Sequence, residues 1–127
     1  QMPRNFKARS HTTVYETIRD GKWRDRLEPL IRDEPTRPPT FYYDLLKPLV
    51  QSLDFWETEY QQILEGDNPV PEYVKGSWLK PFLDALDEPE KSAFEVQYKK
   101  NVLVHYPPQS DGKTLFPFRR LFIVAQV

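Results

Sequence analysis

The sequence has 127 residues, 39% of them hydrophobic, and a net charge of -1, so it can bury one modest core and carries no charge excess that would indicate a nucleic-acid or anionic-membrane partner. It contains no cysteine and only 2 histidines, which excludes disulfides and thiolate metal sites, makes a protein-bound metal unexpected and favours a cytoplasmic location. No apolar stretch approaches the roughly 20 residues of a membrane-spanning helix.

Apolar residues recur at helical spacing in several short segments, separated by prolines and glycines. Side chains that commonly cap helices stand before some of these segments. The expected helices span residues 11–20, 23–31, 41–50, 72–75 and 80–86, with a longer one after residue 87. The expected caps are Ser10 or Thr12, Thr40 and Asp87.

The longest predicted helix carries an apolar stripe. Phe94, Tyr98 and Val102 lie four residues apart, and His105 or Tyr106 continues the same face. This spacing is typical of an amphipathic helix packed on a core. We therefore expect His105 to be a satisfied core histidine.

Two segments carry strand signals. Residues 53–61 alternate apolar and polar side chains, as in a half-buried strand, whereas the run over residues 122–125 has no polar break and predicts a strand covered on both faces. We expect these strands to pair and the last strand's other edge to lack a partner. Residues 1–3 read as the end of a further strand, so we expect the sequence to begin inside a larger protein.

Four segments in this order resemble the trans-aconitate 2-methyltransferase family. They are QMPRNF with the following His11, then FYYDLLKPL, YVKGSWLKPFLDAL and HYPPQSDGKTLFPFRRLFIVA. The resemblance is colinear and covers the whole chain. It implies the C-terminal part of a class I methyltransferase that depends on S-adenosylmethionine.

That family implies a mostly α, α+β fragment of a Rossmann-like core, with the last strand antiparallel between its two predecessors. Residues 1–64 would be the C-terminal portion of the core, residues 65–111 a helical insert or lid, and residues 112–127 the last core strand. The glycine-rich loop that holds the cofactor would lie upstream, so the expected partner is a missing N-terminal half and no cofactor-binding residue is expected here.

The sequence departs from the family at four positions: Arg4, Trp78, Lys80 and Arg119. Lys80 stands where the family has an arginine, which keeps the charge but loses the two-pronged geometry that suits a carboxylate. These changes predict a weaker or different acid substrate.

The implied reaction esterifies a carboxylate of trans-aconitate or a related small polycarboxylic acid. Because a carboxylate is already ionised at neutral pH, no general base is needed and no catalytic residue is expected. The site instead needs cations, amide and hydroxyl donors, and aromatic walls. The residues expected to bind substrate are Asn5, His11, Tyr42, Tyr43, Trp78, Lys80 and Arg120.

Most of these residues also have an ordinary structural alternative, which for His11 is a helix-start residue with a satisfied ring. Asn5 can bond nearby backbone, the two tyrosines can simply pack, and Trp78 can pin the insert to the sheet. Arg119 and Arg120 are adjacent on a strand and point to opposite faces, so at most one faces the pocket and either can be that one.

Two rival functions remain open. The chain can be a non-catalytic α+β module that binds other proteins, or part of a methyltransferase for a different small molecule. For the methyltransferase fragment we expect no activity in isolation, and an exposed sheet edge would allow it to form a homodimer.

Overall fold

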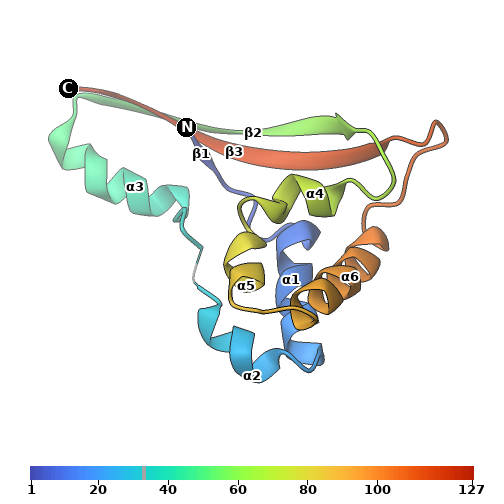
Figure 1. Ribbon diagram of the computed structural model, residues 1–127. Coiled ribbons are helices and arrows are strands. Elements are labelled where there is room, and N and C mark those ends of the chain that lie inside the picture. The colour runs from blue at the N-terminus through green and yellow to red at the C-terminus, as the bar shows by residue number, and fades with distance from the viewer. Residues whose placement is uncertain (33) are drawn as a thin grey trace. The chain divides into compact units, whose positions relative to one another are not determined.

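The computed structural model describes residues 1–32 and 34–127 (Figure 1). These residues form an α+β structure, as the sequence predicts, with one three-stranded sheet. The strands are β1 (Met2–Pro3), β2 (Ser52–Leu64) and β3 (Thr114–Gln126). The helices are α1 (Arg9–Asp20), α2 (Arg24–Leu27), α3 (Pro39–Leu46), α4 (Val70–Lys75), α5 (Lys80–Asp84) and α6 (Glu90–Leu103), with 3-10 turns η1 (Glu28–Leu30) and η2 (Lys47–Leu49).

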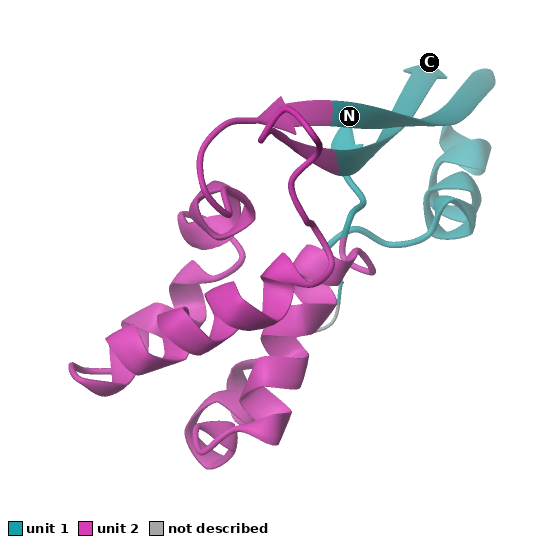
Figure 2. Cartoon of the chain, turned by 90° about the vertical axis from the view of Figure 1, so that its right-hand side faces the viewer, with its two compact units in different colours: residues 1–5, 33–61, 117–127 teal, residues 6–32, 62–116 magenta. Residues whose placement is uncertain are grey.

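The chain divides into two compact units (Figure 2). We call residues 1–5, 33–61 and 117–127 the sheet unit, and residues 6–32 and 62–116 the helical unit. Helices α1 and α2, which precede the predicted insert in the sequence, belong to the same unit as that insert. The predicted boundaries after residues 64 and 111 stay a prediction.

The last strand lies in the middle of the sheet, in the order β1-β3-β2. Met2 pairs antiparallel with Leu121, and Pro3 pairs with Arg120. The expectation that the second edge of β3 lacks a partner is therefore wrong at these two positions. Met2 and Pro3 do lie in a strand, and that this strand is the end of a longer one stays a prediction.

Two contacts between the β2 and β3 segments show how these strands are oriented. The backbone N–H of Gln51 donates to the carbonyl of Gln126 at 2.7 Å, whereas Trp56 stacks on Phe122 with ring centroids 5.2 Å apart. Position rises on one strand as it falls on the other, so the strands are antiparallel. The pairing predicted between these two segments is confirmed.

The prediction that β3 is covered on both faces is wrong towards its end. Leu121 is fully buried, but Val124 is 56% exposed and Ala125 is exposed as well. Phe122 is only half-buried, against the ring of Trp56 from the neighbouring strand. Among the described residues, the Trp56 ring covers Phe122, while Val124 and Ala125 of the same run stay exposed.

The core of the helical unit forms around α6, which packs on α1, α4 and α5. Phe94, Tyr98 and Val102 are fully buried, so the predicted stripe is confirmed. Tyr106, four residues after Val102, continues it at 9% exposure. His105 is one position out of phase and half-buried, with Arg9 Nε donating to its Nδ1 at 3.3 Å, so its prediction as a core histidine is wrong.

The helix starts differ from those predicted. α1, α3 and α6 begin after Ala8, Pro38 and Pro89, and none of these starts has a side-chain cap. Proline at the first position of α3 suits a helix start because its missing N–H would be unpaired there. α3 ends before the predicted residue 50, because Pro48 lacks a backbone donor and the chain tightens into η2 over Lys47–Leu49. Within residues 1–32 and 34–127, no helix combines the length and apolar character needed to cross a bilayer.

Candidate functional site

Four rings of the helical unit gather with that of Trp78, which lies in the turn between α4 and α5. The centroid of the Trp78 ring lies 4.6 Å from that of His11, 5.3 Å from Phe6 and 5.8 Å from Tyr15. The ring of Phe82 lies 6.5 Å from that of Tyr15. We call these five residues the Trp78 cluster. It brings together two of the predicted site residues, His11 and Trp78.

His11 is uncharged at neutral pH. It is only 7% exposed, and burial lowers its pKa from 6.5 to about 4. The Oγ of Ser10 lies 3.0 Å from Nδ1 of His11, so one ring nitrogen already has a partner. A neutral imidazole carries one N–H donor and one acceptor. His11 can therefore take part in a hydrogen bond but cannot supply a positive charge.

Ser10 is itself held by two tyrosines of the α6 stripe. Its backbone N–H donates to the Tyr106 hydroxyl at 3.0 Å, and its carbonyl accepts from the Tyr98 hydroxyl at 2.7 Å. Burial raises the pKa of Tyr98, so this phenol stays protonated as the donor. The start of α1, and with it His11, is thus fixed to α6.

A pocket of about 130 Å³ opens beside the Trp78 cluster. Trp78, Tyr15 and Phe82 line it, together with Leu30, Ser77, Pro81 and Arg32. The sequence reasoning missed Arg32, Tyr15 and Phe6. Only the fold brings the segment after η1 against α5, so spacing along the chain gave no signal for Arg32.

Lys80, which with Arg120 is one of the two basic side chains predicted to bind substrate, forms an ion pair within α5. Its Nζ lies 2.7 Å from Oδ2 of Asp84, one helical turn along α5, and its side chain is 59% exposed. The same pair lowers the pKa of Asp84. Lys80 does not line the pocket beside Trp78.

Asn5 and Arg120 lie in the sheet unit. Asn5 is 7% exposed; its Oδ1 accepts from the backbone N–H of Arg119 at 3.2 Å, and its Nδ2 is buried with no partner among the described residues. The guanidinium of Arg120 donates to Oε1 of Gln1 at 2.7 Å, whereas that of Arg119 lies 3.8 Å from Glu59. A buried amide with a free donor is the more unusual arrangement, because such donors are nearly always paired.

Tyr42 and Tyr43 stand on α3 of the sheet unit. The Tyr42 hydroxyl accepts from the backbone N–H of Arg37 at 3.0 Å. Tyr43 is 41% exposed and its ring lies 6.2 Å from that of Phe55, with Lys47 Nζ 5.0 Å from its centroid. Both tyrosines thus have packing or bonding partners within their own unit.

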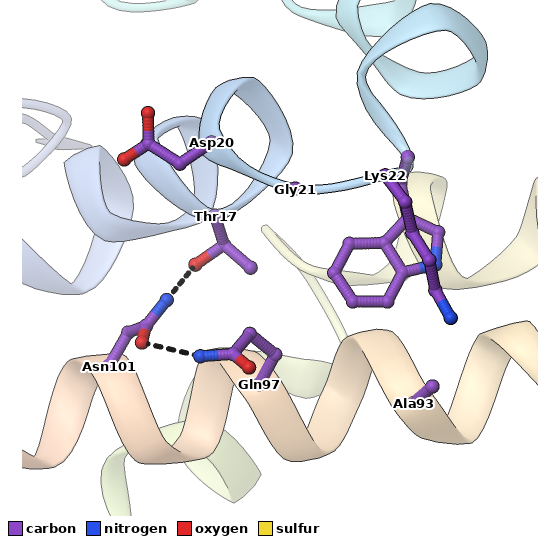
Figure 3. Close-up of a pocket in the computed structure, with 8 residues that line it drawn as sticks. Thr17, Asp20, Gly21, Lys22, Ala93, Gln97 and Asn101 are labelled. Atoms are coloured by element: carbon purple, nitrogen blue, oxygen red, sulfur yellow. Dashed lines mark hydrogen bonds between the residues drawn. The ribbon is translucent and has the colours of Figure 1, made fainter.

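A larger and more polar pocket, of about 640 Å³, lies between the end of α1 and α6 (Figure 3). Gln97 Nε2 donates to Asn101 Oδ1 at 2.8 Å, and Asn101 Nδ2 donates to Thr17 Oγ1 at 3.0 Å, so two amides and a hydroxyl form a hydrogen-bonded chain along one wall. None of the predicted site residues lines this pocket. The spacing of Gln97 and Asn101 on one helix face was the available signal.

The glycines present do not fit a cradle for S-adenosylmethionine. Gly66 and Gly112 have positive φ angles of 102° and 84° and stand in turns with open space where a side chain would be, as does Gly76. A Cβ on Gly21 would meet Trp23 at 2.7 Å, so this glycine serves packing. The site of such a cofactor needs several glycines in one strand–loop–helix turn. Among residues 1–32 and 34–127, no group of three or more His, Cys, Asp or Glu side chains could hold a metal ion.

Comparison with known proteins bears on what these residues do. No protein-family model matches the chain. It is 42% identical over 125 residues to trans-aconitate 2-methyltransferase of Azoarcus sp. (strain BH72). It is also 42% identical over 126 residues to the protein of that name from Rhodopseudomonas palustris (strain HaA2), and 36% identical over 126 residues to that of Agrobacterium fabrum.

The chain matches about half of a trans-aconitate 2-methyltransferase. Each of these matches covers 98% of the chain and 49% of the relative's length. The resemblance predicted from the four colinear segments is thereby confirmed. The chain spans about half the length of the curated relatives it matches.

Proposed function

We propose that this chain is the substrate-side part of a methyltransferase that depends on S-adenosylmethionine and esterifies one carboxylate of trans-aconitate or a related small polycarboxylic acid. The observation that carries the proposal is the similarity to trans-aconitate 2-methyltransferases along 98% of the chain. In this proposal the chain is the C-terminal part of a Rossmann-like core, and residues 65–111 form its helical insert or lid.

The chemistry makes modest demands on the chain's own residues. The attacking carboxylate is ionised at neutral pH, so the protein must align it, exclude water and hold the remaining carboxylates. A neutral His11 and the buried Nδ2 of Asn5 suit this task as hydrogen-bond donors. Trp78 suits it as an apolar wall. Lys80, Arg120, Tyr42 and Tyr43 complete the proposed substrate-binding set.

The methyl donor would be bound mainly by other residues of the intact protein. This part of the proposal rests on the glycines, which stand singly in turns or pack on neighbouring side chains. The chain alone is therefore expected to be inactive, while the intact protein is expected to bind both the donor and the acid.

A methyl-transfer assay tests the proposal. The intact protein would be incubated with S-adenosylmethionine carrying a ¹³C-labelled methyl group and with trans-aconitate, and the product analysed by mass spectrometry. We expect one labelled methyl per product molecule, in a monomethyl ester. Absence of ester from trans-aconitate and from a panel of related di- and tricarboxylic acids would contradict the proposal.

A further inference from the structure

The pocket beside the Trp78 cluster has one charged group among its lining residues, Arg32. The other residues that line it are aromatic or aliphatic, apart from the Ser77 hydroxyl. Three rings form its walls: Tyr15, Trp78 and Phe82. An apolar pocket with one convergent cation is typical of a site that orients a small anion with an apolar body.

Arg32 differs from Arg9, Arg24 and Arg26 of its unit, each of which forms an ion pair. Arg24 lies 2.8 Å from Glu28, and Arg26 lies 2.9 Å from Glu90. No ion pair joins Arg32 to another described residue. Its guanidinium is thus available to a ligand, and its planar fork of donors matches the two oxygens of a carboxylate.

Trp78 supplies both a wall and a donor. Its ring is backed by Phe6 and His11, which hold it in place. Its Nε1 is buried and has no partner among the described residues. Buried indole N–H groups usually find an acceptor, so an unpaired one beside a pocket favours an acceptor brought in by a ligand.

The size of the pocket limits what it can hold. Sites for whole small molecules usually span about 300–1,000 Å³, whereas this pocket measures about 130 Å³. It therefore suits one arm of an acid rather than an entire tricarboxylate. Flat aromatic walls favour a flat arm, in which a carboxylate is conjugated with a carbon–carbon double bond.

We propose that Arg32 and Trp78 bind one carboxylate of a planar, unsaturated acid, with Arg32 pairing both oxygens and the rings of Tyr15 and Trp78 covering the carbon skeleton. This inference rests on the proposed function. It assigns the substrate-binding cation of the helical unit to Arg32, in addition to the residues proposed above.

Kinetics and direct binding on the intact protein test this assignment. Arg32→Met removes the fork, Arg32→Lys keeps the charge but loses the paired geometry, and Arg24→Met removes a surface arginine of the same unit as a matched control. Each variant would be titrated with trans-aconitate by calorimetry and assayed for methyl-ester formation.

For Arg32→Met we expect binding of trans-aconitate to weaken by about 10- to 100-fold, the loss typical of a hydrogen-bonded charge pair. KM should rise by a similar factor, with kcat changed much less, because the contact holds substrate rather than the reacting atoms. Arg32→Lys should fall between Arg32→Met and the wild type, and Arg24→Met should stay within about twofold of the wild type. The assignment would be overturned if the Arg32→Met variant bound trans-aconitate as tightly as the Arg24→Met variant does.

A pair of acids tests the planar-arm argument. Propane-1,2,3-tricarboxylate has the same carbon skeleton as trans-aconitate without its double bond, and we expect it to bind more weakly to the wild type. That preference should shrink in Arg32→Met; equal binding of both acids to the wild type would overturn the planar-arm assignment. If the wild type binds trans-aconitate through Arg32 but forms no ester, the proposed function fails while the site stands.

Discussion

The helical unit and the sheet unit differ in how they bury apolar side chains. Among the described residues, every buried hydrophobic side chain except Leu121 belongs to the helical unit. In the sheet unit, Trp56 and Tyr60 on β2 are each 43% exposed, and Leu49 is 68% exposed. The helical unit thus has a core of its own, and it also contains the pocket that we assign to the substrate acid.

This difference shows that some of the proposed site residues pack against a buried core and others do not. His11 and Trp78 pack against a closed core whose polar groups are paired through Ser10. Tyr42 and Tyr43 stand on α3, which has no buried residue. Mutations should therefore cost more stability in the helical unit than in the sheet unit, for side chains of similar size.

The largest effect is expected from Phe94→Ala. Phe94 is fully buried and its ring meets that of Trp23 edge-on at 5.2 Å. Truncating a buried phenylalanine loses its transfer free energy and leaves a cavity, so we expect the free energy of unfolding to fall by about 3–5 kcal/mol. Urea unfolding followed by circular dichroism measures it. A loss below about 1 kcal/mol would mean that the unit's core is not closed as described.

The pKa of His11 tests whether the core of the helical unit excludes water from this side chain. Its pKa in the folded state, about 4, lies below the ordinary value of 6.5. The unfolded chain therefore binds the proton more readily, and stability should fall as the pH drops from about 6.5 to about 4, by roughly 3 kcal/mol in total.

Nuclear magnetic resonance of histidine labelled with ¹⁵N reads this pKa directly, and the 2 histidines of the chain keep the assignment simple. His11→Asn is the control, since it should remove this part of the pH dependence of stability. A His11 that titrates near 6.5 in the folded protein would show that the Trp78 cluster is open to water.

Tyr98→Phe should have a smaller effect. The substitution keeps the buried ring but removes the hydroxyl that donates to the Ser10 carbonyl at 2.7 Å. The Ser10 carbonyl keeps its helical partner within α1, so losing this buried hydrogen bond should lower the free energy of unfolding by about 1.5 kcal/mol. Thermal unfolding of Tyr98→Phe beside Tyr60→Phe, whose side chain is 43% exposed, measures the difference. If both substitutions lowered the unfolding temperature equally, the hydrogen bond from Tyr98 to Ser10 would not contribute to stability as described.

The smallest effect is expected from Trp56→Ala in the sheet unit. Trp56 is 43% exposed and stacks on Phe122 with an angle of 2° between the rings. The lost stacking contact should lower the free energy of unfolding by about 1 kcal/mol, since aromatic pairs contribute about 0.5–1.5 kcal/mol. Urea unfolding measures this change as it does for Phe94→Ala. A loss as large as that of Phe94→Ala would mean that the sheet unit has a comparable core.

Sequence patterns predicted the parts of the fold that periodicity controls. Phe94, Tyr98 and Val102 mark the buried face of α6 because a spacing of four residues keeps side chains on one face. The unbroken apolar run over residues 122–125 predicted a strand, and these residues lie in β3. The burial of this run could not be predicted from the sequence. Trp56 covers Phe122 only because β2 and β3 pair in a register that brings the two rings together.

The predicted helix caps were wrong where a helix begins at another residue. Asp87 has the sequence form of a cap, but α6 begins at Glu90, directly after Pro89. Arg32 could not be found at all from spacing, since its place in the pocket depends on the segment after η1 lying against α5. The resemblance to relatives pointed instead to Lys80, which the fold pairs with Asp84.

Hydrogen–deuterium exchange on the intact protein, with and without trans-aconitate, tests most directly whether the helical unit holds the acid. We predict slower exchange in peptides that cover residues 9–20, 28–32 and 75–84, which surround the pocket beside the Trp78 cluster. Slower exchange confined to β2, β3 and α3, with no change in those peptides, would contradict the account.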